Sequence, residues 1–409
     1  MTEVAVVGAG AAGLWAAAVC ARAGCGVRIY EKTARTGTKI LASGGTRCNL
    51  TTTLGGREAA ELFRRRGARF LGPAFSALPP ERVRERFAAM GVPTVEAPLE
   101  KIFPASDRAR DVRDALEREA RAAGVAIELG AAVTGIEKTA EDWRLAFAGG
   151  RTVTCRAALV CPGGQSYPRS GTTGDGYRWL RELDLPIVDP VPALVPLSSP
   201  APWVHELTGI AWQEGEVRLA LDGRIVAKRR RPVLFTHRGV SGPGAMDVSV
   251  HVAQVGAATL HLDLYPDLSR DALRARLIEA ARAKGSPRLA RVLPGEPPRR
   301  LVAALGQQVG LKEPNPRMMD VPKDARHRLI ETLKGLAVPV DGTLGFDKAE
   351  VTAGGLELDA VDPRTMQVRG CPGLYVFGEL LDLDGPIGGL NFQAAFACGE
   401  LAGRAAAGP

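Results

Sequence analysis

The chain has 409 residues, of which 45% are hydrophobic and 5% aromatic, and its formal net charge is +8. This length exceeds one ordinary hydrophobic core, so we expect two or three domains. No apolar run reaches the ~18 residues that a membrane span needs, so we expect no membrane-spanning helix.

The spacing of the cysteines and histidines indicates neither a redox pair nor a metal site. The seven cysteines form no C-x-x-C pair, which is typical of reduced thiols. The five histidines lack metal-ligand spacing, so we expect no metal site. The first apolar strand begins at Val4 and leaves no room for a secretory signal peptide, so we expect a cytoplasmic protein.

The opening stretch, V-A-V-V-G-A-G-A-A-G from Val4 to Gly13, organises the prediction. An apolar strand runs into Gly8-x-Gly10-x-x-Gly13, and a small-residue segment from Leu14 to Ala23 follows with the spacing of a helix. In this pattern the glycines allow a tight turn, a close approach of a pyrophosphate, and close helix–strand packing. Glu31 ends the next strand about 20 residues later, where a ribose-binding carboxylate belongs. A plain glycine turn is the alternative, but the combination predicts dinucleotide binding.

A polar loop follows the second strand. Ser43-Gly44-Gly45, with Arg47 and Asn49, places several backbone N–H groups and a guanidinium together, which suits a diphosphate or flavin carbonyls. An ordinary polar loop is the alternative.

The next elements are predicted from periodicity and turn residues. We expect helices within residues 58–89 and 109–123, one strand over 126–138, and a hairpin of residues 142–147 and 151–155. A strand over 157–161 ends at Pro162-Gly163-Gly164. A strand that ends in glycines at this point would bring the chain back to the predicted dinucleotide.

Composition changes near Pro186, where prolines accumulate and short alternating runs replace helical periodicity. We predict an antiparallel β insert over residues 187–265, with a hairpin turn at Asp222-Gly223. Within it, His237 is a candidate acid or base because its unperturbed pKa is near neutrality. A structural role in a Gly/Pro-rich loop is the alternative.

A basic helical insert is predicted over residues 266–335. From Pro266 to Ile330 there are 14 Lys/Arg against 7 Asp/Glu, so this segment carries +7 of the net charge. Such a face could bind RNA or an acidic partner. We expect a solvated Arg-rich surface and no nucleic-acid partner, and RNA modification is the alternative.

The last strongly patterned stretch runs from Gly373 to Gly399. It is an apolar strand, an acidic turn, a glycine pair and a small-residue helix. If the ligand is FAD, Gly378, Glu379 and Asp382 can reach its ribityl chain or diphosphate. The helix that begins near Asn391 would then point its N-terminus at the flavin, where reduced flavin carries negative charge.

Four stretches together resemble one known family. The motif K-I-L-A-S-G-G-T-R-C-N from Lys39 to Asn49, and residues 163–177, 234–243 and 345–399, are similar to the BaiN-like and aminoacetone-oxidase-like family of NAD(P)/FAD-dependent oxidoreductases. Most members have Gly at the position of Thr46. The resemblance implies an α/β fold: a Rossmann-like FAD-binding domain built from both chain ends, an inserted antiparallel, barrel-like β domain, and a small helical insert.

The implied domains are residues 1–186 with 345–409 for FAD, 187–265 with 336–344 for the substrate, and 266–335 for the basic insert. Lys39 and His237 are the candidate catalytic residues, from their polarity and their matching motifs. The residues expected to contact FAD are Gly8, Gly10, Ala11, Gly13, Glu31, Lys32, Lys39, Ser43, Gly44, Gly45, Arg47, Cys48, Asn49, Val133, Gly163, Gly164, Gly378, Glu379, Asp382, Gly388, Gly389, Asn391 and Phe392.

The predicted function is FAD-dependent oxidation or reduction of a small molecule by hydride transfer at flavin N5. The resemblance allows two outcomes: an oxidase that passes electrons from an amine to molecular oxygen, or an NAD(P)H-dependent reductase of a conjugated C=C bond. Only one dinucleotide fingerprint is present, so NAD(P)H is expected only as a transient reductant. A non-catalytic flavin sensor is a further alternative.

Overall fold

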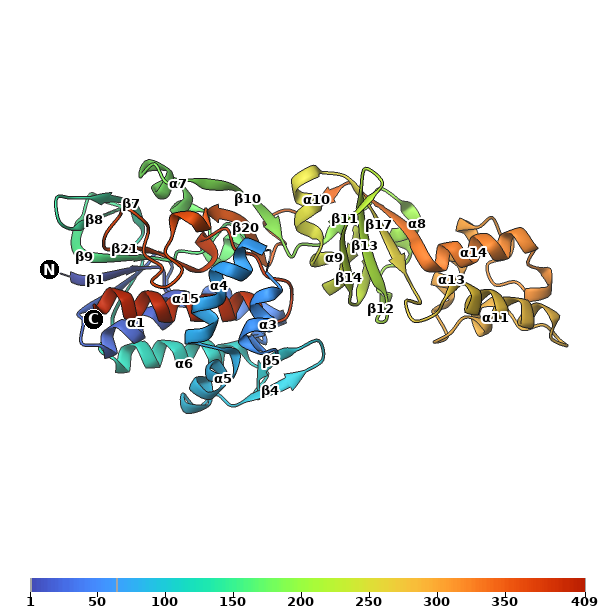
Figure 1. The fold of residues 1–409 in the computed structure, drawn as a ribbon, viewed down its shortest axis with the longest axis horizontal. Helices are drawn as coiled ribbons and strands as arrows, with labels where there is room; N and C mark the ends of the chain where they lie inside the picture. The colour runs from blue at the N-terminus through green and yellow to red at the C-terminus, as the bar shows by residue number, and fades with distance from the viewer. Residues whose placement is uncertain (1, 64, 409) are drawn as a thin grey trace. The chain divides into compact units, whose positions relative to one another are not determined.

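The computed structural model describes residues 2–63 and 65–408. The chain divides into two compact units (Figure 1). The first unit contains the residues up to Pro192 together with those from Phe346 onward, and the second contains Ala193–Gly345. Each unit buries its own hydrophobic core.

A parallel sheet forms the centre of the first unit. Strand β1 pairs with β2 on one side and with β9 on the other, β6 extends the sheet beyond β2, and β21 pairs with the carboxyl half of β9. The order of the strands therefore reverses between β1 and β9, which makes a topological switch point. These strands span Thr2–Val7 (β1), Val27–Glu31 (β2), Ala126–Leu129 (β6), Thr152–Val160 (β9) and Leu374–Val376 (β21).

Two helices from opposite ends of the chain cover this sheet. Figure 1 shows α15 (Leu390–Ala407) lying beside α1 (Ala11–Arg22). Small residues permit the close approach: a Cβ added to Gly403 would lie 2.6 Å from the carbonyl oxygen of Ala16. Because helices cover its faces, β1 is buried without alternation from Val4 to Val7.

The predicted hairpin of residues 142–147 and 151–155 is confirmed by β8 (Trp143–Phe147) and its antiparallel pairing with β9. The single strand predicted over 126–138 is wrong. The chain turns at Gly130, where φ is +68°, and forms β6 and then β7 (Val133–Lys138), which pairs with β8.

Shorter elements complete the first unit. β3, β4 and β5 form a small antiparallel sheet, and β10 pairs with β20. Their bounds are α2 (Thr38–Ala42), η1 (Ser43–Thr46), β3 (Thr51–Thr52), α3 (Gly56–Glu61), α4 (Arg65–Ala77), α5 (Pro80–Ala89), β4 (Thr94–Ala97), β5 (Lys101–Pro104), α6 (Ala109–Ala122), η2 (Pro168–Ser170), α7 (Asp175–Glu182), β10 (Ile187–Ala193), β20 (Val351–Leu356), η4 (Leu358–Ala360) and η5 (Gly378–Leu380).

The second unit contains two antiparallel sheets and a helical segment. The predicted hairpin at Asp222-Gly223 is confirmed, because both residues have positive φ and join β13 to β14. The strands and first helices are β11 (Leu197–Ser198), α8 (Pro202–Glu206), β12 (Ala211–Trp212), β13 (Glu216–Leu221), β14 (Arg224–Arg230), β15 (Val233–Thr236), β16 (Gly239–Ser241), α9 (Pro243–Met246), α10 (Ser249–Val255), β17 (Ala258–Asp263), β18 (Leu336–Val340) and β19 (Gly342–Thr343). The helical segment contains α11 (Arg270–Arg282), α12 (Leu289–Val292), α13 (Arg299–Gln308), η3 (Met318–Asp320) and α14 (Lys323–Gly335).

The predicted fold class is confirmed: a parallel Rossmann-like core with additional antiparallel sheets. Among the residues described, no helix is long and apolar enough to cross a bilayer.

Candidate cofactor and active site

The predicted glycine turn lies at the topological switch point. Gly8 has a φ of +104°, and a Cβ there would lie 2.7 Å from the carbonyl oxygen of Cys161 at the end of β9. A Cβ on Gly13 would lie 2.0 Å from the carbonyl oxygen of Gly8, so only glycine lets α1 pack this closely on the turn. A Cβ on Gly10 would meet nothing within 4 Å.

Gly10 is the N-cap of α1, and no side chain caps this helix. The first N–H groups of the helix, beginning with Ala11, have no acceptor within the helix. Together with the open space beside Gly10, they form a place where a phosphate can bind.

Glu31 is fixed beside this turn. Its Oε2 accepts a hydrogen bond from the backbone N of Ala9 at 2.8 Å, and its Oε1 accepts from the N and Oγ1 of Thr33, both at 2.8 Å. Val133 begins β7 two residues after Ala131, whose N donates to the carbonyl oxygen of Glu31 at 2.9 Å. Glu31 and Val133 are thus near each other in the first unit, and their contacts with the ribose and adenine stay predictions.

The segment after β2 folds back onto the glycine turn, because the N of Gly37 donates to the carbonyl oxygen of Ala9 at 2.8 Å. The chain then passes through a left-handed stretch at Gly44, Gly45 and Thr46, with φ values of 54°, 67° and 72°. Positive φ is uncommon for a β-branched residue such as threonine. Most members of the family have Gly at the position of Thr46, and glycine adopts this left-handed conformation without strain.

The side chains of this loop anchor it to neighbouring elements. Arg47 Nε lies 2.5 Å from Asp107 Oδ1, and its guanidinium stacks 4.1 Å above the ring of Phe103. The Oδ1 of Asn49 accepts from the N of Ile102 at 3.1 Å. The predicted cofactor contacts of these two side chains are not tested, but both side chains already have partners within the protein.

Three further residues that were predicted to contact FAD are held by the protein itself. Ser43 Oγ donates to the carbonyl oxygen of Ile40 at 2.7 Å. Cys48 is buried, and burial raises the pKa of its thiol to about 12, so it is a neutral thiol at pH 7. Lys32 Nζ donates to Thr173 Oγ1 and Asp175 Oδ2, both at 2.6 Å, and so ties α7 to the end of β2.

Lys39 and Glu379 meet in the first unit. Lys39 Nζ lies 2.5 Å from Glu379 Oε2 and donates to Ser166 Oγ, also at 2.5 Å. Ser166 Oγ donates to the other oxygen of Glu379, and the backbone N of Thr352 donates to that same oxygen at 2.9 Å. These four residues, which we call the Lys39 cluster, bring together segments that are up to 340 positions apart.

Glycines make room for the Lys39 cluster. A Cβ on Gly164 would lie 2.4 Å from Thr352 Oγ1 and 3.0 Å from Glu379 Oε1. Gly163 has a φ of +88°, and Gly378 has a φ of +74° and packs its backbone against Ala12 of α1. The glycines predicted after β9 and β21 thus let both turns pack tightly.

Sequence analysis missed Ser166 and Thr352. The signal for Ser166 was its place directly after the glycines that end β9. Nothing local marked Thr352, whose hydroxyl accepts from the backbone N of both Gln165 and Ser166.

Helix α15 begins without a side-chain cap at Gly389, which has a φ of +82°. A Cβ on Gly388 would meet nothing within 4 Å. Asn391 bonds the backbone N and O of Gly385 at 2.9 and 2.8 Å and so closes the preceding loop. The ring of Phe392 stacks on that of Phe396, and Asp382 Oδ1 accepts from the N of Gly354 at 3.1 Å.

His237 belongs to the second unit. It is exposed in the turn between β15 and β16. Its catalytic role stays a prediction.

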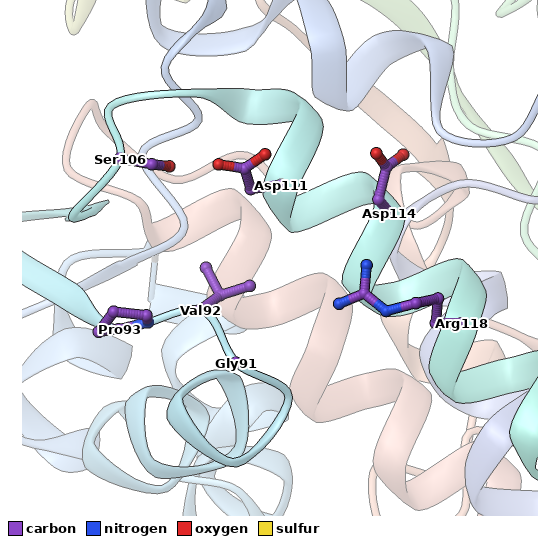
Figure 2. Close-up of a pocket in the computed structure, with 7 residues that line it drawn as sticks. All are labelled: Gly91, Val92, Pro93, Ser106, Asp111, Asp114 and Arg118. Atoms are coloured by element: carbon purple, nitrogen blue, oxygen red, sulfur yellow. The ribbon is translucent and has the colours of Figure 1, made fainter.

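A surface pocket of about 270 Å³ lies elsewhere on the first unit (Figure 2). It is bordered by Asp111, Asp114 and Arg118 of α6, and Arg118 donates to the carbonyl oxygen of Met90 at 3.3 Å. None of the predicted cofactor residues borders this pocket, so it is separate from the candidate site.

The residues at the switch point fit an extended dinucleotide. Helix α1 begins there without a side-chain cap, and a Cβ on Gly10 would meet nothing within 4 Å. Thr38 Oγ1, directly before Lys39, is buried without a hydrogen-bond partner, although buried hydroxyls normally have one. A polar cofactor would supply these missing acceptors and donors.

Comparisons with known proteins agree with this geometry. The family described as the HI0933-like protein Rossmann domain matches residues 2–405. A ribosomal RNA dihydrouridine synthase of Escherichia coli (strain K12) is 31% identical, over 97% of this chain and 96% of the relative. A 3-dehydro-bile acid delta(4,6)-reductase of Clostridium scindens is 30% identical, over 100% of this chain and 99% of the relative.

Among solved structures, the 3-ketosteroid delta1-dehydrogenase of Sterolibacterium denitrificans has the same fold, with a TM-score of 0.50 at 14% identity and coverage of 99% of both chains. The match to the quinol fumarate reductase FrdA of E. coli has a TM-score of 0.50 at 16% identity and covers 99% of this chain and 70% of that one. With the family match over nearly the whole chain, the resemblance seen in the sequence is confirmed: the protein belongs to the HI0933-like Rossmann family and is an FAD-dependent oxidoreductase.

Proposed function

We propose that this enzyme reduces C=C bonds that are conjugated to a carbonyl group. One observation carries the proposal: two relatives, a ribosomal RNA dihydrouridine synthase and a 3-dehydro-bile acid delta(4,6)-reductase, are named for the same kind of bond change. Dihydrouridine is uridine with the C5=C6 bond next to the C4 carbonyl saturated, and a delta(4,6)-reductase of a 3-dehydro compound saturates bonds conjugated to the C3 carbonyl. The ring systems differ, whereas the reacting group is common to both.

FAD would be held by residues from both chain ends. The N-terminus of α1 and Gly8–Gly13 suit its diphosphate, and Glu31 suits its adenosine ribose. The N-terminus of α15 suits the flavin ring, whose reduced form is anionic. When bound, FAD supplies the hydride, and the protein supplies orientation and electrostatics.

The reaction also needs a proton. Hydride adds to the carbon β to the carbonyl, and a proton must reach the α carbon. We assign that proton to Lys39 Nζ, which Glu379 and Ser166 hold in place at 2.5 Å each. The neighbouring Tyr177 is a poor donor, because burial and the charge of Glu379 raise the pKa of its hydroxyl far above neutrality.

The overall reaction consumes one NAD(P)H and one proton for each C=C bond. A reduced nicotinamide passes its hydride to the oxidised enzyme and leaves, which agrees with the presence of one dinucleotide fingerprint in the sequence. The amine oxidase outcome would need molecular oxygen and no nicotinamide.

Anaerobic stopped-flow absorption tests the proposal. NADPH or NADH should bleach the flavin band, and a 3-oxo-4-ene steroid or a uridine-containing RNA should then restore it, with a gain of two hydrogens in the product. The proposal is rejected if nicotinamides leave the band unchanged, or if amines bleach it and only oxygen restores it.

A further inference from the structure

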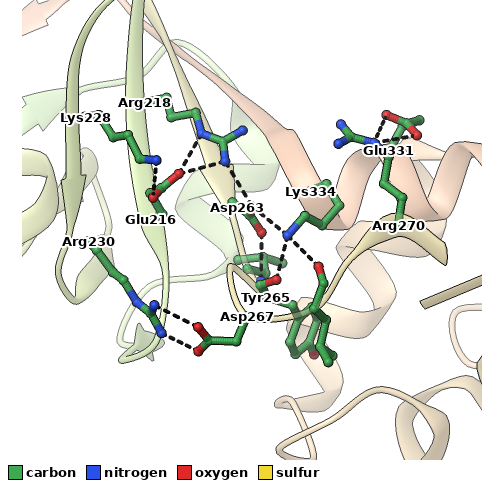
Figure 3. A network of polar contacts seen from close by, with 12 residues as sticks. Glu216, Arg218, Lys228, Arg230, Asp263, Tyr265, Asp267, Arg270, Glu331 and Lys334 are labelled. Carbon is green, nitrogen blue, oxygen red and sulfur yellow. Dashed lines mark hydrogen bonds and ion pairs between the residues drawn. The ribbon is translucent and has the colours of Figure 1, made fainter. Parts of the chain in front are cut away.

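Two buried carboxylates of the second unit are neutralised by basic side chains of the same unit (Figure 3). Asp263 pairs with Lys334 Nζ at 2.8 Å and with Arg218 Nη2 at 3.2 Å. Glu216 pairs with the same Nη2 atom at 2.7 Å and with Lys228 Nζ at 2.8 Å. Because buried charges need such partners, this network stabilises its own unit and by itself indicates no ligand site.

Two thiols of the first unit have no part in the proposed reaction. All seven cysteines of the chain are free, and none belongs to a C-x-x-C motif. Cys20 lies in the last turn of α1, and Cys25 lies in the turn that leads from α1 to β2. The fold of this turn brings the two residues together, although their spacing in the sequence gives no such indication.

The backbone at the end of α1 sets the positions of the two cysteines. The N of Cys25 donates to the carbonyl oxygen of Cys20 at 3.5 Å. The N of Gly24, whose φ is +98°, donates to the carbonyl oxygen of Ala21 at 2.9 Å. This pair of bonds is a Schellman motif, in which the first and last side chains commonly contact each other. Cys20 and Cys25 occupy these two positions.

The two thiols are neighbours and differ in exposure. Burial raises the pKa of the Cys20 thiol, and the Cys25 thiol, which is within hydrogen-bonding reach, raises this pKa further. Cys20 is 0% exposed, whereas Cys25 is half-buried. A Cβ on the adjacent Gly24 would meet nothing within 4 Å. Cys25 is therefore the thiol that an external reagent reaches, and Cys20 is the thiol behind it.

Two other helices of the first unit end in the same motif without cysteines. At the end of α6, the N of Val125 donates to the carbonyl oxygen of Ala120 at 3.1 Å. At the end of α5, the N of Val92 donates to that of Phe87 at 2.8 Å. All four side chains are buried and apolar. Packing at this motif thus needs only an apolar pair, so the end of α1 does not require two thiols.

The groups around Cys25 leave its thiol able to ionise. Cys25 Sγ lies 3.9 Å from the carbonyl oxygen of Ala407 and within hydrogen-bonding reach of the Glu3 carboxylate. A negative charge beside a thiol opposes formation of the thiolate. Arg156 offsets this charge, because its Nη2 lies 3.3 Å from Glu3 Oε1.

We propose that Cys20 and Cys25 form a reversible thiol–disulfide site that reacts with low-molecular-weight disulfides such as oxidised glutathione. The thiolate of Cys25 attacks one sulfur of the reagent, forms a mixed disulfide and releases one glutathione. The thiolate of Cys20 then attacks Cys25 Sγ and releases the second glutathione. The protein gives up two electrons and two thiol protons, and the reagent takes them up as two glutathione thiols.

This site is separate from the proposed cofactor site. The glycine turn lies at the start of α1 and the cysteine pair at its end, and a helix of 12 residues is about 18 Å long. The inference therefore does not rest on the proposed function.

The test is intact mass spectrometry of the full chain after incubation with oxidised glutathione under native conditions. The parent protein carries Cys371→Ser, because Cys371 is the other half-buried cysteine. It should lose the mass of two hydrogens, and excess reduced glutathione should restore them. Trypsin cleaves after Arg22, so an unreduced digest should contain residues 1–22 linked to residues 23–28.

Two variants in the same background separate the roles of the thiols. Cys20→Ser should gain one glutathionyl group on Cys25 and keep it, because the thiol that displaces it is missing. Cys25→Ser should not react, because Cys20 is buried.

A matched control tests whether the cysteines serve only in packing. Cys20→Ala/Cys25→Val copies the Ala120 and Val125 pair of α6, so it should fold like the parent by circular dichroism and keep its mass in oxidised glutathione. The proposal is overturned if the parent does not react, or if it keeps a glutathionyl group on Cys25 without closing. It is also overturned if any variant loses two hydrogens, because a different pair of cysteines would then have formed the disulfide.

Discussion

At Lys39 the ammonium group is held by two oxygens, Glu379 Oε2 and Ser166 Oγ, each 2.5 Å away. If Lys39 donates the proton, Lys39→Met should lower the rate of C=C reduction by about 10²–10⁴-fold. Lys39→Arg restores the positive charge beside Glu379 but donates a proton poorly, because the pKa of arginine exceeds about 12. It should therefore restore stability and FAD binding without restoring turnover.

Single-turnover reoxidation of the reduced enzyme by an enone measures this rate, with its pH profile. Lys348→Met, an exposed lysine of the same unit, is the control and should be unchanged. A role for Lys39 in packing alone predicts instead that Lys39→Arg recovers the wild-type rate and profile.

Thr46 offers a second prediction at the scale of one residue. Its φ of 72° is a left-handed conformation, which costs an L-residue about 1–2 kcal/mol, while glycine adds an unfolded-state entropy penalty of about 0.5–1 kcal/mol. Thr46→Gly should therefore raise the free energy of unfolding by about 0.5–1 kcal/mol. Denaturant unfolding measures it, and Thr53→Gly, at a residue without positive φ, should lower stability.

At the scale of elements, α15 is held to α1 and α5 by one buried carboxylate. Glu400, 3% exposed, accepts from Trp15 Nε1 and Arg86 Nη1, both at 2.8 Å, and from Arg404 at 2.6 Å. Glu400→Gln leaves two arginines without their counter-charge. Because these arginines are partly exposed, we expect a loss of about 2–3 kcal/mol in the free energy of unfolding, below the full cost for a buried pair.

Chemical denaturation compares this variant with Glu182→Gln, which removes an exposed pair with Arg178 and should change stability by less than about 0.5 kcal/mol. Similar effects of the two variants would contradict a special role for Glu400.

Helix α7 provides a pH-dependent contact. Burial alone would raise the pKa of Asp175, but hydrogen bonds from Lys32 and Thr173 outweigh it and hold that pKa below its usual value. A lowered folded-state pKa adds stability above the unfolded value of about 3.9, and this stability is lost as the pH falls through the folded value. Between pH 7 and pH 3, the free energy of unfolding should therefore fall less for Asp175→Asn than for wild type. If it falls equally in both proteins, the contact does not contribute to stability.

The elements differ in how well the sequence predicts them. The strand, turn and helix at residues 4–23 follow from local rules, because Gly8 and Gly13 have conformations and contacts that only glycine allows. The break at Gly130 was missed, since the apolar pattern continues across it. The contacts within the Lys39 cluster could not be predicted from the sequence. Lys39 and Glu379 were predicted as separate candidates, and no spacing rule places residues 340 positions apart in contact. Nor does any such rule add Thr352 to them.

At the scale of the whole molecule, the proposed FAD site draws on β1, β9, β21 and α15, which belong to the first of two units with separate cores. A ligand that binds only the folded state stabilises it by about 2.7 kcal/mol at 100 times its dissociation constant. FAD should therefore slow amide hydrogen exchange in the first unit, in peptides from β1, β9 and the start of α15.

Peptides from β13 and β17 of the second unit are the internal control within the same sample. Because that unit has its own core, their exchange should be the same with and without FAD, apart from any peptide that contacts the flavin directly. Protection that spreads over both sheets of the second unit would show that the two units unfold together, and it would reject the division of the chain into an FAD domain and inserted domains. Protection that is absent from β1 and α15 would reject the cofactor site itself.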